Sequence, residues 1–273
     1  MVVSDYKQAE IAALANLSGD PTLIDSVSKG LDIHSVVCRD MFRLDCTLEE
    51  VKMEHKALRV AAKSIVFGLL YGRGPKAIAR EVEKAGVSCT VTEAREFVET
   101  FMSQFPLVSK LIDDTHLQVE ELGYVDTVWG RRAFYPKIQS DEYEGILAGQ
   151  KRQAFNLLIQ GYVADMLRVA LIAFGEYRRD HPDVKYKIIL TVHDSIVAEV
   201  PEEYVEKVAL EVFPYCMTER AVCPALPFQV GTDTDVCVRW DEPLHMADVD
   251  HLSLSDSFLQ QFVSDYEEES ATT

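Results

Sequence analysis

The stretch KIILTVHDSIVAEV, residues 187–200, decides the fold class of this chain. Its two halves, residues 187–192 and 196–200, are rich in β-branched residues, and the polar sequence HDS lies between them. This pattern predicts a β-hairpin whose tight turn presents the carboxylate of Asp194. Because helical patterns fill most of the chain before this hairpin, we expect an α+β fold with a helical middle between β-containing ends.

Asp5 has a similar setting, because the apolar sequence VVS precedes it. We expect a short strand from Val2 that runs into a helix ending near Gly19. A carboxylate presented from a sheet edge is costly to bury unless it is paired or binds a cation. Asp5 and Asp194 together could hold two Mg²⁺ ions about 4 Å apart, which would clamp the attacking and leaving oxygens of a phosphoryl transfer. The alternative is that both aspartates are ordinary solvated side chains.

Caps, prolines and glycines predict the remaining elements. Thr47 and Glu50 form a capping box that opens a helix over residues 48–71. The other expected elements are helices from Pro75 to Gly86, from a cap at Thr92 to before Pro106, from Pro106 to Gly123, over residues 148–179 and over residues 202–217, a hairpin over residues 124–135, and a last strand over residues 235–240.

The sequence RVAAKSIVFGLLYG, residues 59–72, carries polar and aromatic side chains at steps of four residues: Arg59, Lys63, Phe67 and Tyr71. On an α-helix they form a slanted stripe about 18 Å long, at about 1.5 Å of rise per residue. Cations at one end suit a triphosphate, and aromatic rings further along suit a base. The alternative is an amphipathic helix with its aromatics turned inward. Gly68 and Gly72 favour the binding stripe, because a helical glycine costs about 1 kcal/mol unless another chain must approach closely.

The charge balance taken alone argues against a nucleic-acid partner. The 273 residues include 27 Lys and Arg against 45 Asp and Glu, a formal net charge of −18, whereas phosphate binding usually shows as a basic patch. The distribution is uneven, however. Residues 59–80 hold five cations and no acid, and residues 248–273 hold seven acids and no Lys or Arg. The acidity is therefore partly a property of the C-terminal tail.

Several function classes are disfavoured. The six cysteines include no C-x-x-C pair, which indicates reduced thiols of a cytosolic protein and neither a disulfide frame nor a zinc site. The chain has no run of about 18 apolar residues that would predict a membrane span, and its N-terminus lacks a secretory apolar region.

Taken together and in order, the motifs resemble the fingers and palm of family A DNA polymerases, the bacterial DNA polymerase I type. The matching stretches are residues 5–10 with 17–20 (motif A), residues 59–72 (motif B), residues 192–194 (motif C), and the further segments 32–34, 123–132, 152–161 and 239–245. The resemblance implies a right-hand polymerase fold with a partial antiparallel palm, a large helical fingers insertion, and neither thumb nor exonuclease. It places palm at residues 1–18 and 147–245, fingers at 19–146 and an acidic tail at 246–273.

The same resemblance implies roles for the matching residues. Asp5 and Asp194, with the backbone carbonyl of Tyr6, would hold two Mg²⁺ ions, and Lys63 would protonate the pyrophosphate leaving group. Nucleotide contacts are implied for Arg59, Lys63 and His34 at the triphosphate, for Phe67 and Tyr71 near the base and the templating position, and for Gln8 and Glu10. Primer-template contacts are implied for Arg131, Arg132, Arg152, Asn156, Gln160 and His193. For each, the alternative is a structural polar residue.

Three details bear on the substrate. A Glu at the position of Glu10 blocks the 2′-hydroxyl in this family, which favours DNA precursors. Ser195 follows Asp194 where the DNA polymerases usually have Glu, and His-Asp-Ser is common in single-subunit RNA polymerases, so an RNA polymerase fragment stays an alternative. Phe67 in place of Tyr predicts poor acceptance of dideoxynucleotides.

Because the chain begins almost at motif A, we expect a fragment or one subunit of a phage-type split polymerase. A second polypeptide would then carry the thumb and the rest of the palm. The expected function is DNA replication by a DNA-directed nucleotidyltransferase in the cytoplasm, or in the host cytoplasm if a phage encodes it. A non-catalytic scaffold with the same fold is the other alternative. Residues 246–273 are expected to be a solubilising tail or a docking segment for a partner.

Overall fold

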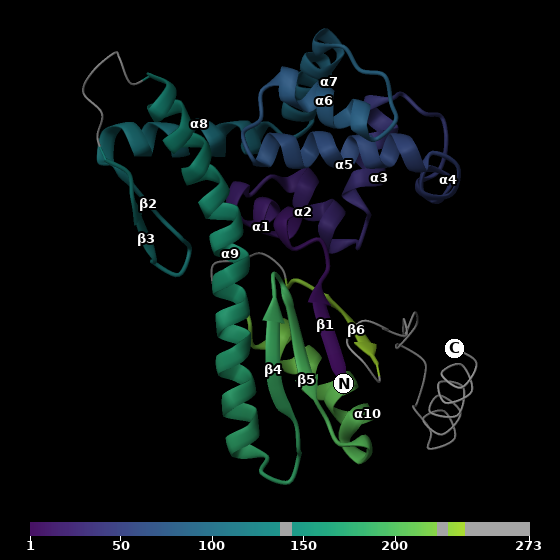
Figure 1. Cartoon of the computed structure of the whole chain (residues 1–273), viewed down its shortest axis with the longest axis vertical. Coiled ribbons are helices and arrows are strands. Elements are labelled where there is room, and N and C mark those ends of the chain that lie inside the picture. Colours follow the sequence, from purple (N-terminus) through teal and green to yellow (C-terminus); the bar gives the residue numbers. More distant parts are fainter. Residues whose placement is uncertain (137–143, 223–228, 238–273) are drawn as a thin grey trace. The chain divides into compact units, whose positions relative to one another are not determined.

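The computed structural model describes residues 1–136, 144–222 and 229–237 (Figure 1). The chain divides into two compact units. The sheet unit comprises residues 1–7, 164–222 and 229–237, and the helical unit comprises residues 8–163. The predicted palm and fingers boundaries, at residues 18 and 146, stay predictions. The sequence segments 239–245 and 246–273 lie outside the described residues, as does Cys223, while the other five cysteines are free thiols.

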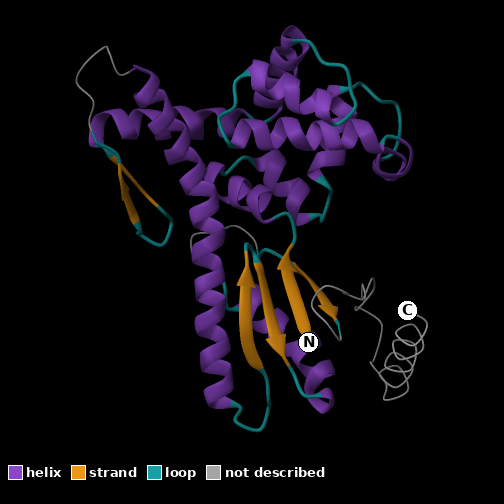
Figure 2. Ribbon diagram, viewed as in Figure 1, coloured by secondary structure: helices purple, strands orange, loops and turns teal. Residues whose placement is uncertain are grey.

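The sheet unit is built on a four-stranded antiparallel sheet in the order β4-β5-β1-β6 (Figure 2). Its strands are β1 (Val2–Tyr6), β4 (Lys187–Val192), β5 (Ser195–Glu199) and β6 (Thr232–Val236). The hairpin predicted over residues 187–200 is confirmed. The last strand, β6, begins at Thr232, three residues before the expected start at residue 235. Residues 238–240 of the expected strand lie outside the described part.

The side chains of β1 alternate between a buried face and a more exposed face of the sheet. Val2, Ser4 and Tyr6 are buried, whereas Asp5 between them is exposed. Ser4 shares a hydrogen bond of 2.8 Å with the hydroxyl of Thr234, and the Tyr6 hydroxyl donates to the Met217 carbonyl at 3.0 Å. One face of β1 is thus fixed in the core, and the other faces solvent.

The helix expected over residues 202–217 is not a regular α-helix. It changes pitch from a 3-10 turn (Glu202–Tyr204) to α10 (Val205–Lys207) and two π-helical segments (Val208–Val212 and Tyr215–Glu219). Pro214, between the two π segments, has no N–H to donate and so interrupts the regular ladder. The segment still buries an apolar face that includes Val208, Val212, Phe213, Cys216 and Met217.

The helical unit contains eight successive helices, a hairpin and the first part of a long ninth helix (Figure 1). They are α1 (Ala9–Ser18), α2 (Pro21–Ser28), α3 (Ile33–Met41), α4 (Leu48–Glu54), α5 (Lys56–Leu70), α6 (Pro75–Lys84), α7 (Val91–Gln104), α8 (Pro106–Leu122), β2 (Tyr124–Asp126), β3 (Arg132–Phe134) and α9 (Glu144–Asp180). The strand and helix expected at the N-terminus, the helices starting at Pro75 and Pro106, the 124–135 hairpin and the long helix over 148–179 are confirmed.

Two helix boundaries differ from the sequence prediction. The helix expected over residues 48–71 is two helices, because His55 leaves helical geometry (φ −111°, ψ 36°) and ends α4 before α5 begins. The N-cap of α7 is Thr90 and not Thr92. Thr90 forms a capping box with Glu93, whose carboxylate accepts from the Thr90 N–H at 2.8 Å. Thr92 has Arg95 three residues later and cannot form such a box.

The residues Gly145–Asp180 of α9 are long and apolar enough to cross a membrane. Protein buries 61 % of the most apolar window of this helix, as expected of a core helix. A single helix of this kind is weak evidence for a membrane span, because a buried core helix has the same length and composition. The absence of a membrane span stays a prediction.

Candidate active site

In the sheet unit, two acidic residues predicted to act together lie close to each other. Asp5 is the next-to-last residue of β1 and pairs in register with Ser195 of β5, and Asp194 lies in the two-residue turn just before that serine. His193 opens this turn with a left-handed φ of 55°. The Ser195 hydroxyl donates to the Val192 carbonyl at 2.9 Å and closes the turn. The hairpin thereby directs Asp194 toward Asp5.

A third carboxylate lies on the other side of Asp5. On β6, Asp233 is directly opposite Asp5, and directly opposed residues of antiparallel strands project to the same face. Asp233 also forms an ion pair with Lys7 at 2.8 Å, in which both side chains are more than half exposed. Sequence reasoning missed Asp233. The sequence TDTDV, residues 232–236, shows alternating aspartates, but no sequence pattern shows which residue of β6 pairs with Asp5 of β1.

The surroundings of Asp5 disfavour its ionised form. Desolvation by its surroundings, the negative charge of Asp194 and a hydrogen bond with Asp194 raise the pKa of Asp5 to about 7. Asp233 adds to this effect, while the Tyr6 backbone N–H opposes it. At neutral pH the group is therefore divided between its protonated and ionised forms. A nearby cation would favour the ionised form of both partners.

The donor chemistry fits Mg²⁺. Mg²⁺ prefers hard oxygen ligands, keeps several waters, and is usually bound through one or two carboxylates plus substrate phosphates. Asp5 and Asp194 supply such oxygens at an open sheet end. Within residues 1–136, 144–222 and 229–237, no cluster of three His, Cys, Asp or Glu side chains could enclose an ion. That Asp5 and Asp194 hold an ion, with the Tyr6 carbonyl as a further ligand, stays a prediction.

In the helical unit, the predicted stripe on α5 is continuous. The Lys63 Nζ lies 5.6 Å from the ring centroid of Phe67, and the rings of Phe67 and Tyr71 stack with centroids 6.1 Å apart. Tyr71 is 37 % exposed, and Phe67 is half-buried. The opposite face carries the buried residues Ala61, Ala62, Ile65, Val66 and Leu69. The aromatic rings therefore lie at the edge of the buried face, and nucleotide binding by this stripe stays a prediction.

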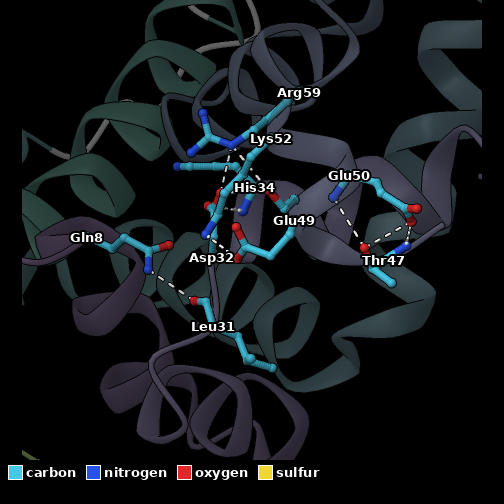
Figure 3. Close-up of polar contacts among 10 residues, drawn as sticks. Gln8, Leu31, Asp32, His34, Thr47, Glu49, Glu50, Lys52 and Arg59 are labelled. Carbon is cyan, nitrogen blue, oxygen red and sulfur yellow. Dashed lines mark hydrogen bonds and ion pairs between the residues drawn. The ribbon is translucent and has the colours of Figure 1, made fainter. Parts of the chain in front are cut away.

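The N-terminus of α3 lies beside this stripe (Figure 3). The Arg59 Nε donates to Asp32 Oδ2 at 2.6 Å, and the His34 ring lies 5.5 Å from the Phe67 ring. His34 is buried, and its Nδ1 has no hydrogen-bond partner in the described part of the chain. Burial lowers the pKa of His34 to about 4, and the nearby Lys63 and Arg59 add to this against the opposing charge of Asp32. A neutral imidazole with an unused nitrogen thus adjoins two cations.

Two motif A side chains also have defined partners in the helical unit. The Gln8 amide donates to the Leu31 carbonyl at 3.1 Å and accepts from the Ile33 N–H at 3.2 Å. The Gln160 Nε2 lies 3.3 Å from both the Glu10 carboxylate and the Tyr71 hydroxyl. The structure thus joins Glu10, Tyr71 and Gln160 in one network. Nucleotide or DNA contact by any of them stays a prediction.

The other basic residues expected to bind DNA already have intramolecular neighbours. Arg131 donates to the Gly161 carbonyl at 3.4 Å. Arg132 forms two 2.8 Å bonds to Asp126, and its guanidinium carbon lies 3.7 Å from the Tyr124 ring centroid. Their predicted DNA contacts, like those of the half-buried Asn156 and the exposed His193, are not tested by these neighbours.

The two motif B glycines serve internal packing. A Cβ on Gly68 would lie 2.9 Å from Ile78 Cγ1, and a Cβ on Gly72 would lie 2.4 Å from Arg152 Cγ. Gly72 also has a left-handed φ of 63°. A side chain at either position would collide with this chain's own Ile78 or Arg152. The interpretation that these glycines make room for another chain is therefore wrong.

Comparison with known proteins gives consistent matches. The model of DNA polymerase family A matches residues 1–242. A DNA polymerase of Escherichia phage T5 is 31 % identical over 255 residues, which cover 86 % of this chain and 30 % of the phage protein. The thermostable DNA polymerase I of Thermus filiformis is 32 % identical over 241 residues, 88 % of this chain and 26 % of that protein. The chain thus spans less than a third of these relatives.

A solved structure is also similar. The POL domain of Pol1 from M. smegmatis, in complex with a DNA primer-template and dNTP, matches with a TM-score of 0.72 and 30 % sequence identity. The match covers 85 % of this chain and 39 % of that one.

Proposed function

The chain belongs to DNA polymerase family A, and from this premise we propose that it catalyses template-directed DNA synthesis. The α+β polymerase fold expected from the sequence, a partial palm with fingers, is confirmed by the structural match. The proposed reaction transfers the deoxynucleotidyl group of a dNTP to a primer: the 3′-oxygen bonds to the α-phosphorus, and pyrophosphate leaves. The observation that carries the proposal is the closeness of Asp5 and Asp194 at one end of the sheet.

Family A polymerases use divalent ions, typically Mg²⁺, and two ions are our proposal for this chain. Bound there, they would stabilise negative charge on the attacking and leaving oxygens. Asp5 and Asp194 would hold them, with the Tyr6 carbonyl as a further ligand. The hydrogen bond within the carboxylate pair must then be lost, because both aspartates bind a cation in their ionised forms.

We propose that the stripe on α5 binds the nucleotide. Arg59 and Lys63 would hold the triphosphate, and the neutral His34 beside them would add a further contact. Lys63 would give a proton to the pyrophosphate as the bond from the α-phosphorus to the bridging oxygen breaks. Phe67 would stack on the incoming nucleotide, and Tyr71 would lie by the templating position.

DNA precursors are the proposed substrates. The relatives are DNA polymerases, so neither the RNA polymerase nor the non-catalytic scaffold is favoured. The hydrogen bond from Gln160 holds Glu10 in place, which supports its proposed role in excluding a 2′-hydroxyl. Primer-template contacts remain proposed for Arg131, Arg132, Arg152, Asn156 and His193. We expect the reaction to take place in the cytoplasm.

Because the chain spans less than a third of its curated relatives, we propose that activity requires further polymerase segments. We propose that a second polypeptide supplies them as a thumb and the rest of a palm. Primer extension by a reconstituted complex, with dNTPs compared against rNTPs, tests the function. Asp194→Asn should abolish extension, whereas Asp183→Asn, a change at an exposed residue of the same unit, should not. Extension by Asp194→Asn at the unmodified rate would overturn the metal assignment.

A further inference from the structure

Asp32 has no role in the proposed mechanism, yet it has the most developed set of contacts at the nucleotide stripe (Figure 3). Its Oδ2 accepts from Arg59 Nε and from the Ser35 hydroxyl, each at 2.6 Å. Its Oδ1 accepts from the His34 N–H at 3.2 Å. We propose that Asp32 is a positioning residue that orients the Arg59 guanidinium toward the triphosphate of a bound nucleotide. This inference rests on the proposed function.

The geometry at Arg59 suits such a role. A guanidinium is planar, and its donors lie in a fixed fork, so a bond at Nε sets the direction of the other two nitrogens. Asp32 and Ser35 both receive the Nε–H, at 2.6 and 3.2 Å. Within the described residues, neither terminal nitrogen makes a hydrogen bond that would compete with a phosphate. Asp32 therefore fixes the plane of the fork and leaves its outer edge available.

The carboxylate is itself held firmly. Its side chain is only 12 % exposed, while that of Arg59 is 32 % exposed. Burial raises the pKa of Asp32, but hydrogen bonds from Arg59 and Ser35 outweigh that effect and lower it overall. Asp32 therefore stays ionised at neutral pH and attracts the guanidinium continuously.

Gln8 braces the backbone on both sides of Asp32. Its amide bonds to the carbonyl of Leu31 and to the N–H of Ile33, the two residues that flank the aspartate. Gln8 makes these bonds from a left-handed backbone conformation with φ of 46°, which non-glycine residues seldom adopt. We infer that Gln8 serves the nucleotide site through this brace.

A purely structural ion pair is the competing explanation, and kinetics separate the two. Asp32→Asn keeps one oxygen, which can still accept from the His34 N–H, and puts an NH2 group in place of the oxygen that holds Arg59. The Ser35 hydroxyl can then accept from this NH2 group, so the main loss is the charge that holds Arg59. In the reconstituted polymerase we expect the dNTP KM to rise about tenfold, as for loss of one charge-assisted hydrogen bond, with kcat changed less than about threefold. Asp40→Asn is the matched control, because Asp40 lies on the same helix and pairs with Arg39 at 3.2 Å.

A double-mutant cycle tests whether Asp32 acts through Arg59. In an Arg59→Gln background, Asp32→Asn should raise the KM no further. Titration with a fluorescent dATP analogue gives a second readout that does not depend on extension. If the unmodified complex binds and extends but Asp32→Asn leaves KM unchanged, or if the two effects on KM are additive, the positioning role is refuted. If the unmodified complex neither binds dNTP nor extends a primer, the proposed function itself fails.

Discussion

Asp5→Asn should stabilise the metal-free protein at alkaline pH, although the same change should abolish polymerase activity. The pKa of Asp5 in the folded chain, about 7, lies above its ordinary value of 3.8. Between these values the folded state binds more protons than the unfolded state, so stability falls as pH rises from about 4 to about 7. Above pH 7 the repulsion between Asp5 and Asp194 is fully present. Asparagine removes it.

The magnitude follows from this pKa difference. A difference of about three units corresponds to about 4 kcal/mol at 1.36 kcal/mol per unit. Asp5 is exposed, however, so water screens its repulsion, and we expect about 1–2 kcal/mol. For a protein of this size that is a rise in Tm of about 2–8 °C.

Thermal unfolding in EDTA at pH 5 and pH 8 measures the effect. We expect Asp5→Asn to unfold at a higher temperature than the unmodified chain at pH 8, and the difference to shrink at pH 5. Excess Mg²⁺ should stabilise the unmodified chain and remove the advantage of the variant. Asp183→Asn serves as the control for loss of an exposed charge. A Tm difference that is the same at both pH values, or a variant that is less stable at pH 8, would contradict the electrostatic reasoning.

Three further predictions concern the helical unit. Lys63→Arg keeps the charge but loses an easily transferred proton, so single-turnover extension should slow by at least tenfold while dNTP affinity changes little; equal rates would argue against the proton transfer. Gly72→Ala should lower the free energy of unfolding in urea by about 2–4 kcal/mol, because the new methyl group would both strain the backbone and clash with Arg152. Gly86→Ala is the control: Gly86 also has a left-handed φ, of 86°, but open space around it, so the cost should be only about 1–2 kcal/mol. Equal costs would show that packing against Arg152 is unimportant. Phe67→Tyr should raise the ratio of dideoxynucleotide to deoxynucleotide incorporation, and an unchanged ratio would remove Phe67 from the sugar site.

Local signals predicted most helix ends and the hairpin over residues 187–200. Short-range patterns fix such features, as the capping box at Thr47 illustrates. The error at Thr92 has the same origin, since Thr90 two residues earlier has the better partner in Glu93. The break at His55 was not predictable from periodicity, because Val51 and Leu58 lie seven residues apart and keep helical spacing on either side of it.

The relations that the sequence could not supply are those between distant elements. Asp233 lies opposite Asp5 only because β6 pairs with β1 in one register, and a shift of one residue would turn it to the other face. The contact of Asp32 with Arg59 spans 27 positions and depends on how α3 packs against α5. Motif resemblance identified Arg59 but gave no reason to choose its counter-ion.

Asp5 and Asp32 show how the setting of a carboxylate indicates its role. Asp32 is nearly buried but satisfied by a cation and two hydrogen bonds, and its pKa is lowered. Asp5 is exposed on one side, yet desolvation by its surroundings and the acidic neighbours Asp194 and Asp233 raise its pKa. A group of the first kind gains little from an added cation, whereas a group of the second kind gains ionisation and relief from repulsion. Mg²⁺ should therefore lower the pKa of Asp5 in an NMR titration and leave that of Asp32 unchanged. The opposite response would place the ion in the helical unit and reverse the assignment.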